Sequence, residues 1–218
     1  EQNAQLEKLN DIVKSYDPHS VISGEGAMTK DLIQVADVDF RNVNITSILA
    51  VFVIILISFC SLSIPVLLVG SIESAIFINM GIPYFTGIQL PFVASIVVGT
   101  IQLGATVDYA ILTTTRFKEE LQNGRTVKEA AHISVEQCSQ SILTSGLTFF
   151  AATASVAAIS QMELISSLCK LISRGALISM LVIILILPAL LIVFAPVIAR
   201  TTRRWPKVQK AASTGKEV

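Results

Sequence analysis

The chain lacks the residue patterns that mark common metal centres and enzyme active sites. Its three cysteines, Cys60, Cys138 and Cys169, do not have the spacing of a zinc site or a disulfide framework. It contains no phosphate-binding loop, which argues against nucleotide-driven pumping. It also has no Gly-x-Ser-x-Gly elbow, so a serine hydrolase is not supported. We expect no metal ion, no organic cofactor and no nucleic-acid partner.

Charged residues are scarce, and apolar residues are abundant. Charged side chains make up 15% of the 218 residues, hydrophobic ones make up 52%, and the mean hydropathy is +0.69. The apolar share of soluble domains normally stays below about half. The composition therefore predicts an all-α membrane protein that crosses the bilayer several times. Cutting the apolar runs where charges, proline and glycine cluster gives five predicted spans, at about residues 44–60, 64–83, 91–115, 140–160 and 171–198.

Basic residues concentrate toward the C-terminal end. Residues 1–41 carry eight acidic and four basic side chains, whereas residues 200–218 carry six basic side chains and one acidic one. Positive charge near the ends of membrane helices favours the cytoplasm. We therefore expect an outside segment over 1–41, a transmembrane domain over 42–199 and a basic cytoplasmic tail over 200–218. The helical loop 116–139, with four basic residues, then lies in the cytoplasm.

Residues 1–41 resemble the end of a larger domain. Apolar residues at helical spacing predict an amphipathic helix over 1–15, followed by a short strand over 19–23 and a second helix over about 27–40. About forty residues are too few to bury a core of their own. We expect them to be the C-terminal remnant of an α+β domain outside the membrane. A chain that starts at Glu1 without a signal peptide further suggests a fragment whose N-terminal part is missing.

The loop over 116–139 contains clear signals for helix ends. Gly124 marks a helix stop, and Thr126 with Glu129 fits a capping box, in which both side chains satisfy the first free amides of a helix. The third span is therefore predicted to continue to about Gln122. A new helix then returns the chain to the membrane.

Asp108 is the residue that most constrains function. It lies about eight residues before Arg116, the first cation after a run of apolar and small polar residues. A rise of about 1.5 Å per residue places its carboxylate about 12 Å inside the span. Such groups usually face the bundle interior and mark an ion or proton path. The alternative interpretation is a static buried acid that fixes helix packing through hydrogen bonds.

The surroundings of Asp108 are small and polar. Gly104 and Ala105 share its helical face and leave room for a neighbouring helix. A carboxyl group in apolar surroundings without a cation holds its proton more tightly than one in water, and nearby hydroxyl donors offset part of this effect. Asp108 is therefore predicted to load and release a proton. The fourth span carries a stripe of small and hydroxyl residues: Ser141, Thr144, Ser145, Thr148, Ala152 and Ser155.

Other polar residues in the spans allow two interpretations each. Glu73, near the middle of the second span, is either a second proton or cation site, or an acid that faces a water-filled cleft or pairs with an upstream helix. Arg174, with Gly175 and Lys170, is interpreted as an anchor at the outer end of the last span. Three further residues are interpreted as helix-packing or kink positions: Gly99, Gly146 and Pro188.

The segment around Asp108 resembles a known family. Gly104-Ala105-Thr106-Val107-Asp108-Tyr109 and the following Arg116 and Glu120 resemble the Gly-x-x-x-Asp-Tyr signature and Arg-x-x-x-Glu segment of the MMPL-type branch of the resistance-nodulation-division (RND) superfamily. Later pieces agree in order: Glu129-Ala130, Ser145-Gly146-Leu147-Thr148, Arg174-Gly175-Ala176 and Leu187-Pro188-Ala189-Leu190. The resemblance covers about residues 20–200.

The resemblance implies twelve spans in two similar halves, each half with a large extracytoplasmic porter domain. The chain would then be a half-bundle of about the last five helices, preceded by the tail of the second porter domain. Asp108 and Tyr109 would form one of two Asp-Tyr pairs that carry the proton, with the other pair in the missing N-terminal half. The third span has no lysine, so the lysine relay of the drug-efflux branch is not available. The residues expected to support the relay or to pack beside it are Gly104, Thr144, Ser145 and Thr148.

The sequence therefore predicts a secondary transporter rather than an enzyme. We expect a proton-driven exporter of lipids, drugs or other amphiphiles in the bacterial cytoplasmic membrane, with protons as the coupling ion. Its partners would be the bilayer, the missing half and an amphiphilic or lipid substrate, and a homo-oligomer stays open. An intramembrane aspartyl protease is less well supported, because the spans contain a single Asp. The competing interpretation is a membrane assembly or scaffold subunit in which Asp108 is structural.

Overall fold

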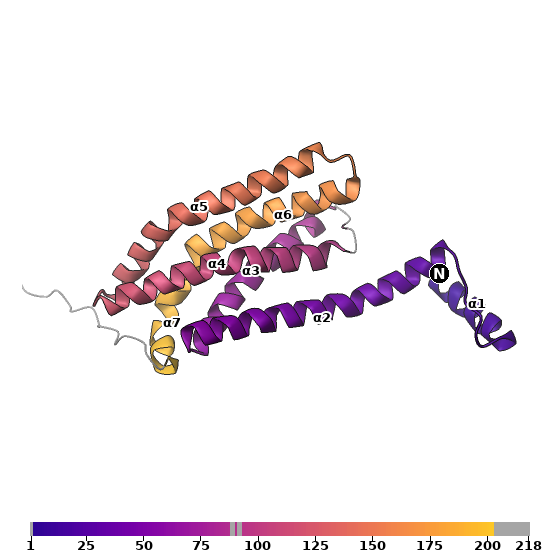
Figure 1. The fold of residues 1–218 in the computed structure, drawn as a ribbon, viewed down its shortest axis with the longest axis horizontal. Helices are drawn as coiled ribbons and strands as arrows, with labels where there is room; N and C mark the ends of the chain where they lie inside the picture. The colour runs from indigo at the N-terminus through magenta and orange to yellow at the C-terminus, as the bar shows by residue number, and fades with distance from the viewer. Residues whose placement is uncertain (1, 88–89, 91–92, 203–218) are drawn as a thin grey trace, which may run out of the picture. The chain divides into compact units, whose positions relative to one another are not determined.

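The computed structural model describes residues 2–87, 90 and 93–202 (Figure 1). The predicted tail over 200–218 lies outside the described residues from residue 203 onward, as do residues 91 and 92 of the predicted third span. Contacts divide the chain into two units, Glu1–Val43 and Asn44–Val218. Each unit is described by itself.

The first unit contains α1 (Gln2–Tyr16) and the beginning of α2 (Glu25–Phe59). The helix predicted over 1–15 is confirmed. The strand predicted over 19–23 is wrong, because an irregular segment follows a turn in which the backbone N–H of His19 donates to Asp17 Oδ1 at 3.0 Å. A strand needs a neighbour to satisfy its backbone groups, and the described part of this unit contains no other strand.

Helix α2 is longer than predicted. The sequence predicts a helix over about 27–40 and a separate first span from 44, whereas α2 runs without a break to Phe59. Residues 27–59 contain neither glycine nor proline, so no residue in this stretch interrupts the helical hydrogen bonds. The helix ends before Cys60, whose φ of 49° is left-handed.

Five helical segments of the described chain are long and apolar enough to cross a membrane. They are Val38–Phe59 in α2, α3 (Ser63–Thr86), α4 (Ala94–Gln122), α5 (Val127–Ile159) and Glu163–Thr201. The last segment consists of α6 (Glu163–Leu181), the π-helix η1 (Val182–Ile186) and α7 (Leu187–Thr201). This confirms the predicted all-α, multi-span architecture.

The turn between α4 and α5 follows the sequence signals closely. Helix α4 ends at Gln122, as predicted. The hydroxyl of Thr126 accepts a bond from the N–H of Glu129 at 3.4 Å, and the N–H of Thr126 donates to Glu129 Oε2 at 2.9 Å. The predicted capping box is therefore confirmed.

A π-helix marks the change from α6 to α7. Pro188 lies two residues after the end of the π-helix and is the second residue of α7. Proline has no N–H to donate, and its ring clashes with a carbonyl one turn earlier. A single wide π turn accommodates such a break without ending the helix. The interpretation of Pro188 as a point of helix distortion is confirmed.

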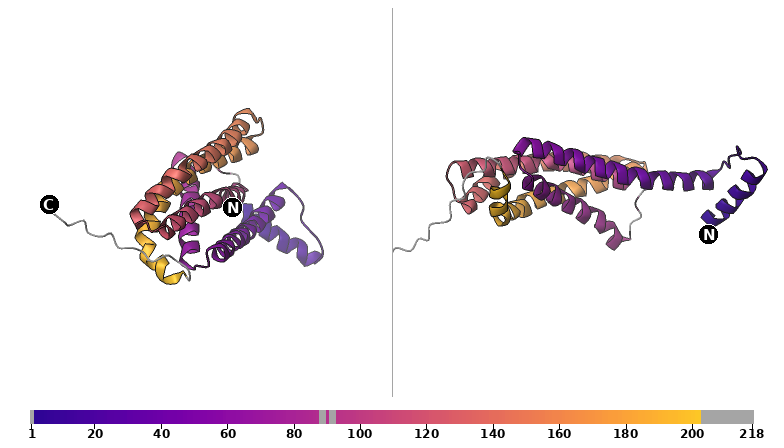
Figure 2. Two further views of the ribbon diagram at one scale, coloured as in Figure 1. Left: turned by 60° about the vertical axis from the view of Figure 1, so that its left-hand side comes forward. Right: turned by 90° about the horizontal axis from the view of Figure 1, so that it is seen from below.

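Helices α4, α5 and α6 pack together in the transmembrane unit. Helix α6 follows α5 and runs antiparallel along it, and α4 contacts both helices (Figures 1 and 2). Helix α3 contacts α4, α6 and α7. Gly146 allows close approach of α5 and α6, because a Cβ there would lie 3.0 Å from Met180 Sδ. A Cβ at Gly99 would meet no described atom within 4 Å, so only Gly146 of these two is a packing position.

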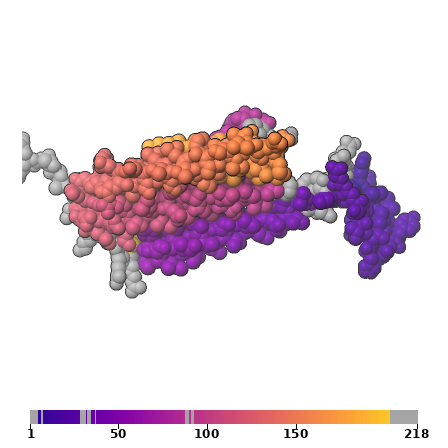
Figure 3. Space-filling model, turned by 45° about the horizontal axis from the view of Figure 1, so that its top comes forward, coloured from indigo at the N-terminus to yellow at the C-terminus, as the bar shows by residue number. Residues whose placement is uncertain are grey.

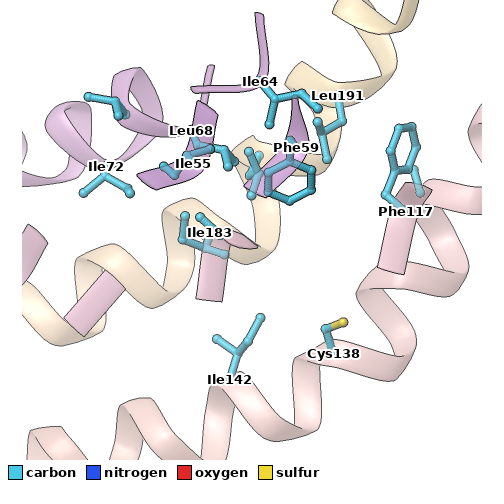
Figure 4. Packing of buried hydrophobic residues seen from close by; sticks show 14 of the residues in the cluster. Ile55, Phe59, Ile64, Leu68, Ile72, Phe117, Cys138, Ile142, Ile183 and Leu191 are labelled. Atoms are coloured by element: carbon cyan, nitrogen blue, oxygen red, sulfur yellow. The ribbon is translucent and has the colours of Figure 1, made fainter. Parts of the chain in front are cut away.

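The core of this unit is an apolar cluster to which the C-terminal end of α2 and all the later helices contribute. Figure 4 labels ten buried members, from α2, α3, α4, α5, η1 and α7: Ile55, Phe59, Ile64, Leu68, Ile72, Phe117, Cys138, Ile142, Ile183 and Leu191. Lipid tails are as apolar as these side chains, so close packing is what holds them together in a bilayer. Lys118 lies over the ring of Phe59, with Nζ 5.9 Å from the ring centroid.

Hydroxyl contacts tie the end of α7 to the turn between α2 and α3. Thr202 Oγ1 donates to Ser61 Oγ at 2.7 Å, and the hydroxyls of Ser63 and Thr201 lie 2.7 Å apart. The backbones of Ser61 and Thr202 also form an isolated bridge. The α2–α3 turn and the end of α7 therefore lie at the same end of the transmembrane unit.

Candidate functional site

Asp108 lies on a face of α4 that the described chain leaves uncovered. Residues on the opposite side of α4 are buried against α3, α5 and α6, among them Gln102, Thr106 and Ala110. Asp108 and Gly104, one turn earlier, are both exposed. The face that the sequence assigned to Asp108 is thus the open face of the helix.

The hydroxyl stripe of α5 is also exposed. The exposed members are Ser141, Thr144, Ser145, Thr148, Ala152 and Ser155. Helix α5 packs beside α4, and Figure 3 shows the two helices next to each other on one face of the molecule. The hydroxyl stripe and the Asp108 face, which come from separate spans, therefore belong to neighbouring helices.

Tyr109 and Ser145 connect the two helices. Their hydroxyl oxygens lie 3.0 Å apart, within hydrogen-bond distance, and either oxygen is able to donate. The half-buried ring of Tyr109 packs against the apolar core, which holds the hydroxyl in place. Tyr109 follows Asp108 directly, so this contact joins α4 to α5 one residue from the carboxylate.

The other predicted supporting residues do not contact Tyr109 through a described hydrogen bond. The hydroxyls of Thr144 and Thr148 donate to carbonyls of their own helix, at Gln140 and Thr144, at 2.8 and 2.7 Å. A Cβ at Gly104 would meet no described atom within 4 Å. Of these residues the structure brings only Ser145 to the Asp-Tyr pair.

The burial of Asp108 differs from the expectation drawn from the sequence. The sequence predicts a buried acid inside the bundle, whereas Asp108 is exposed within the chain. No described residue forms a hydrogen bond or an ion pair with its carboxylate. The physical reason is that burial depends on what covers α4, and no described helix covers this face.

Glu73 lies apart from this site, on the half-buried side of α3. Its Oε1 atom is buried without a hydrogen-bond partner among the described residues. Ser71 and Ser74, its neighbours, donate to carbonyls of their own helix at Leu67 and Gly70. No described hydrogen bond or ion pair connects Glu73 with Asp108.

A polar cluster that the sequence did not predict lies where α3, α4 and α6 meet. Asn79 Nδ2 donates to Gln102 Oε1 at 2.9 Å, and Gln102 Nε2 donates to Ser179 Oγ at 2.8 Å. Arg174 donates from Nε to Asn79 Oδ1 at 2.9 Å and from Nη2 to the Asn79 carbonyl at 2.8 Å. These four residues are called the polar cluster below. The sequence signal for it was an amide residue inside each of two apolar spans.

Gly175 makes the polar cluster possible. A Cβ there would lie 2.5 Å from both Asn79 Nδ2 and Gln102 Oε1. The sequence places Arg174 at the end of the last span, whereas the apolar segment begins at Glu163, eleven residues earlier. Arg174 binds α6 to α3 through Asn79, and the absence of a side chain at Gly175 lets the amides meet against α6.

A cluster of ion pairs lies near the α4–α5 turn. Arg116 forms ion pairs with Glu119 at 2.8 Å and with Glu120 at 3.1 Å, and it also donates a hydrogen bond to Gln137 of α5. The Arg-x-x-x-Glu segment is therefore an intrahelical pair, Arg116 with Glu120, that also contacts the next helix. Because Glu120 is buried, its pairing satisfies a charge that would be costly if left alone.

Comparison with known proteins agrees with this architecture. Protein SCO6666 of Streptomyces coelicolor is 30% identical over 174 residues, which cover 78% of this chain and 24% of that protein. Protein YdgH of Bacillus subtilis is 28% identical over 155 residues, 65% of this chain and 17% of that protein. Both are named as membrane proteins. The chain therefore spans about a quarter or less of the length of these relatives.

The family assignment rests on nearly the whole length of the chain. A model built from the MMPL family matches residues 1–214. The match includes the Asp-Tyr pair, the hydroxyl stripe and the polar cluster. This multi-span membrane chain belongs to the MMPL family.

Proposed function

We propose that this chain is part of a proton-driven exporter of lipids, drugs or other amphiphiles in the bacterial cytoplasmic membrane. Asp108 and Tyr109 carry the proton, and Ser145 holds the hydroxyl of Tyr109. The observation that carries the proposal is the 3.0 Å contact between Tyr109 and Ser145 beside an intramembrane carboxylate. Ionisable residues in membrane spans are functional by default.

The relay requires a second group opposite Asp108. The open face of α4 and the exposed hydroxyl stripe of α5 support this requirement, because no described residue satisfies the Asp108 carboxylate. We propose that the N-terminal half of the same transporter, with its own Asp-Tyr pair, covers this face. The relatives are about four times longer than the matched segment or more, which leaves ample length for such a half.

Proton movement supplies enough energy for a conformational cycle. One elementary charge that crosses 100 mV provides about 2.3 kcal/mol. Protonation removes the charge of Asp108 and so changes which of two arrangements of the open face is more stable. A free-energy difference of that size changes the ratio of two states about fifty-fold.

The proposed orientation places residues 1–41 outside and the basic end inside. The capped α4–α5 turn, with Arg116, Arg125 and Lys128, then faces the cytoplasm, in agreement with the preference of basic residues for that side. Substrate selection belongs to domains outside the bundle. The bundle itself supplies the coupling to protons.

The test is transport by the complete protein that contains this chain, reconstituted in liposomes with an imposed pH gradient. A fluorescent phospholipid analogue and a cationic dye serve as probes for the two substrate classes. Asp108→Asn keeps size and hydrogen-bonding capacity but cannot change charge, so we expect it to abolish transport of whichever probe the wild type moves. Asp11→Asn, at an exposed acid of α1, is the matched control and should transport normally.

The result separates the two functional interpretations. Undiminished transport by Asp108→Asn at equal reconstitution would refute the relay and favour a scaffold role with a structural acid. Loss of transport in Asp108→Asn, with the same elution profile as the wild type, supports the relay. Tyr109→Phe should then slow transport as well, because it removes the hydroxyl that Ser145 contacts.

A further inference from the structure

A small, partly enclosed space lies between two residues of the polar cluster, Gln102 and Ser179, and Tyr109. It lies between α4, α5 and α6, and its lining includes Gln102, Thr106, Tyr109 and Ser179. The volume open to the centre of a water molecule is about 10 Å³. A single water needs about 10–15 Å³ by this measure and two to four polar partners. The space therefore has the size for one water molecule.

The lining groups also have unused hydrogen-bonding capacity. Gln102 Nε2 carries two hydrogens, and Ser179 Oγ accepts one of them at 2.8 Å. Because Ser179 accepts that bond, its own hydroxyl hydrogen is left to donate. Gln102 and Ser179 are buried, with 3% and 1% of their surface exposed, so bulk solvent does not satisfy these donors.

Tyr109 and Thr106 supply partners on the other side of the space. Thr106 donates its hydroxyl hydrogen to the carbonyl of Gln102 at 2.6 Å, which leaves its lone pairs free to accept. Tyr109 and Ser145 share one hydrogen in their 3.0 Å contact, so one further hydroxyl hydrogen remains between them. Gln102, Thr106 and Tyr109 are four and three residues apart and therefore share one face of α4.

We propose that this space binds one structural water molecule, which joins Tyr109 to the polar cluster. The hydrogen-bond chain then runs from Arg174 through Asn79, Gln102 and the water to Tyr109 and Ser145. Gln102 and Ser179 thereby become positioning residues for Tyr109. Their role in transport rests on the proposed function, whereas the water site itself does not.

The proposed chain of hydrogen bonds would hold the hydroxyl of Tyr109 in a defined position. Arg174 and Asn79 join α6 to α3, and Gln102 joins α4 to both, so the cluster links three helices. The Tyr109 hydroxyl, bonded to the polar cluster through the water and to Ser145 directly, keeps one orientation. Proton transfer depends on such alignment of donor and acceptor.

The direct test is a map of the complete transporter in a lipid nanodisc, at a resolution that reveals ordered water. We expect one water within hydrogen-bond distance of Tyr109 Oη and Gln102 Nε2. Ala176→Val, which adds two methyl groups to the lining, should expel it. An empty space in the wild type would overturn the proposal.

A spectroscopic test uses matched serine variants on α6. Ser179→Ala removes a lining hydroxyl, whereas Ser173→Ala removes a buried hydroxyl that donates to the Lys170 carbonyl and lies outside the cavity lining. The infrared band of the Tyr109 phenol is isolated as the difference from Tyr109→Phe. Ser179→Ala should shift this band, and Ser173→Ala should not. Equal spectra for the two variants would refute the link to Tyr109.

Transport measurements separate this inference from the proposed relay. If Asp108→Asn still transports while the water and the band shift are present, the relay fails and the water site stands. If Asp108→Asn abolishes transport but the space is empty, the relay stands and the water site fails. We expect both to hold, with Ser179→Ala slower than Ser173→Ala.

Discussion

Arg174 of α6 donates two hydrogen bonds to Asn79 of α3, one to the side-chain oxygen at 2.9 Å and one to the backbone carbonyl at 2.8 Å. The planar fork of a guanidinium group suits this double contact, and a lysine ammonium does not. We therefore expect Arg174→Lys to leave a buried acceptor of Asn79 unsatisfied and to destabilise the protein by about 1–3 kcal/mol. Lys170→Ala, at an exposed position one turn earlier, is the control. Thermal unfolding of the purified protein in detergent measures both, and equal midpoints for the two variants would contradict the expectation.

Gly175→Ala tests how tightly the polar cluster is packed. The new methyl group would lie 2.5 Å from atoms of Asn79 and Gln102, so these side chains must shift. We expect a net loss of about 1–3 kcal/mol from overpacking, despite the better helix propensity of alanine. Gly70→Ala on α3 gains the same propensity and meets no described atom within 4 Å. Unfolding by titration with a denaturing detergent should place Gly70→Ala at or above the wild type and Gly175→Ala below it.

The bond between Tyr109 and Ser145 is measurable by a double-mutant cycle. Tyr109→Phe and Ser145→Ala each remove one hydroxyl of the 3.0 Å contact. We expect their effects on unfolding to be coupled by about 0.5–1.5 kcal/mol. The control pair combines Tyr109→Phe with Thr144→Ala, because the Thr144 hydroxyl bonds to its own helix. Coupling of the same size in both pairs would contradict a specific bond between Tyr109 and Ser145.

The orientation in the membrane is open to chemical labelling. Asn123 lies in the α4–α5 turn and Gln161 in the α5–α6 connection, and both are exposed. In a background without Cys60, Cys138 and Cys169, we expect a membrane-impermeant maleimide to label Gln161→Cys on intact cells. Asn123→Cys should react only after the membrane is opened. The reverse pattern would invert the proposed topology.

Properties that depend on neighbouring residues in the sequence were predicted well. The capping box of Thr126 and Glu129 involves residues three apart, so the local sequence contains all the atoms that form it. The helix end at Gln122 and the distortion beside Pro188 have similarly local causes. The strand over 19–23 was predicted wrongly because a strand depends on a partner, and the described residues of its unit contain none.

The candidate site was only partly visible in the sequence. Asp108, Tyr109 and the hydroxyl stripe stand out because polar groups are costly in an apolar span. Which hydroxyl reaches Tyr109 depends on how α4 and α5 are rotated against each other. The sequence suggests three supporting hydroxyl residues: Thr144, Ser145 and Thr148. Of these, the structure joins only Ser145 to Tyr109 by a described hydrogen bond.

The sequence by itself determined that the chain crosses a membrane several times, because the length and hydrophobicity of each span are local quantities. It also determined which helix carries the ionisable group. Only the tertiary structure decided that Asn79, Gln102 and Arg174 meet, since residues from three helices come together only through the crossing of those helices. It also decided that Asp108 faces outward from this chain, because exposure depends on the elements that pack over a face and not on the residue itself.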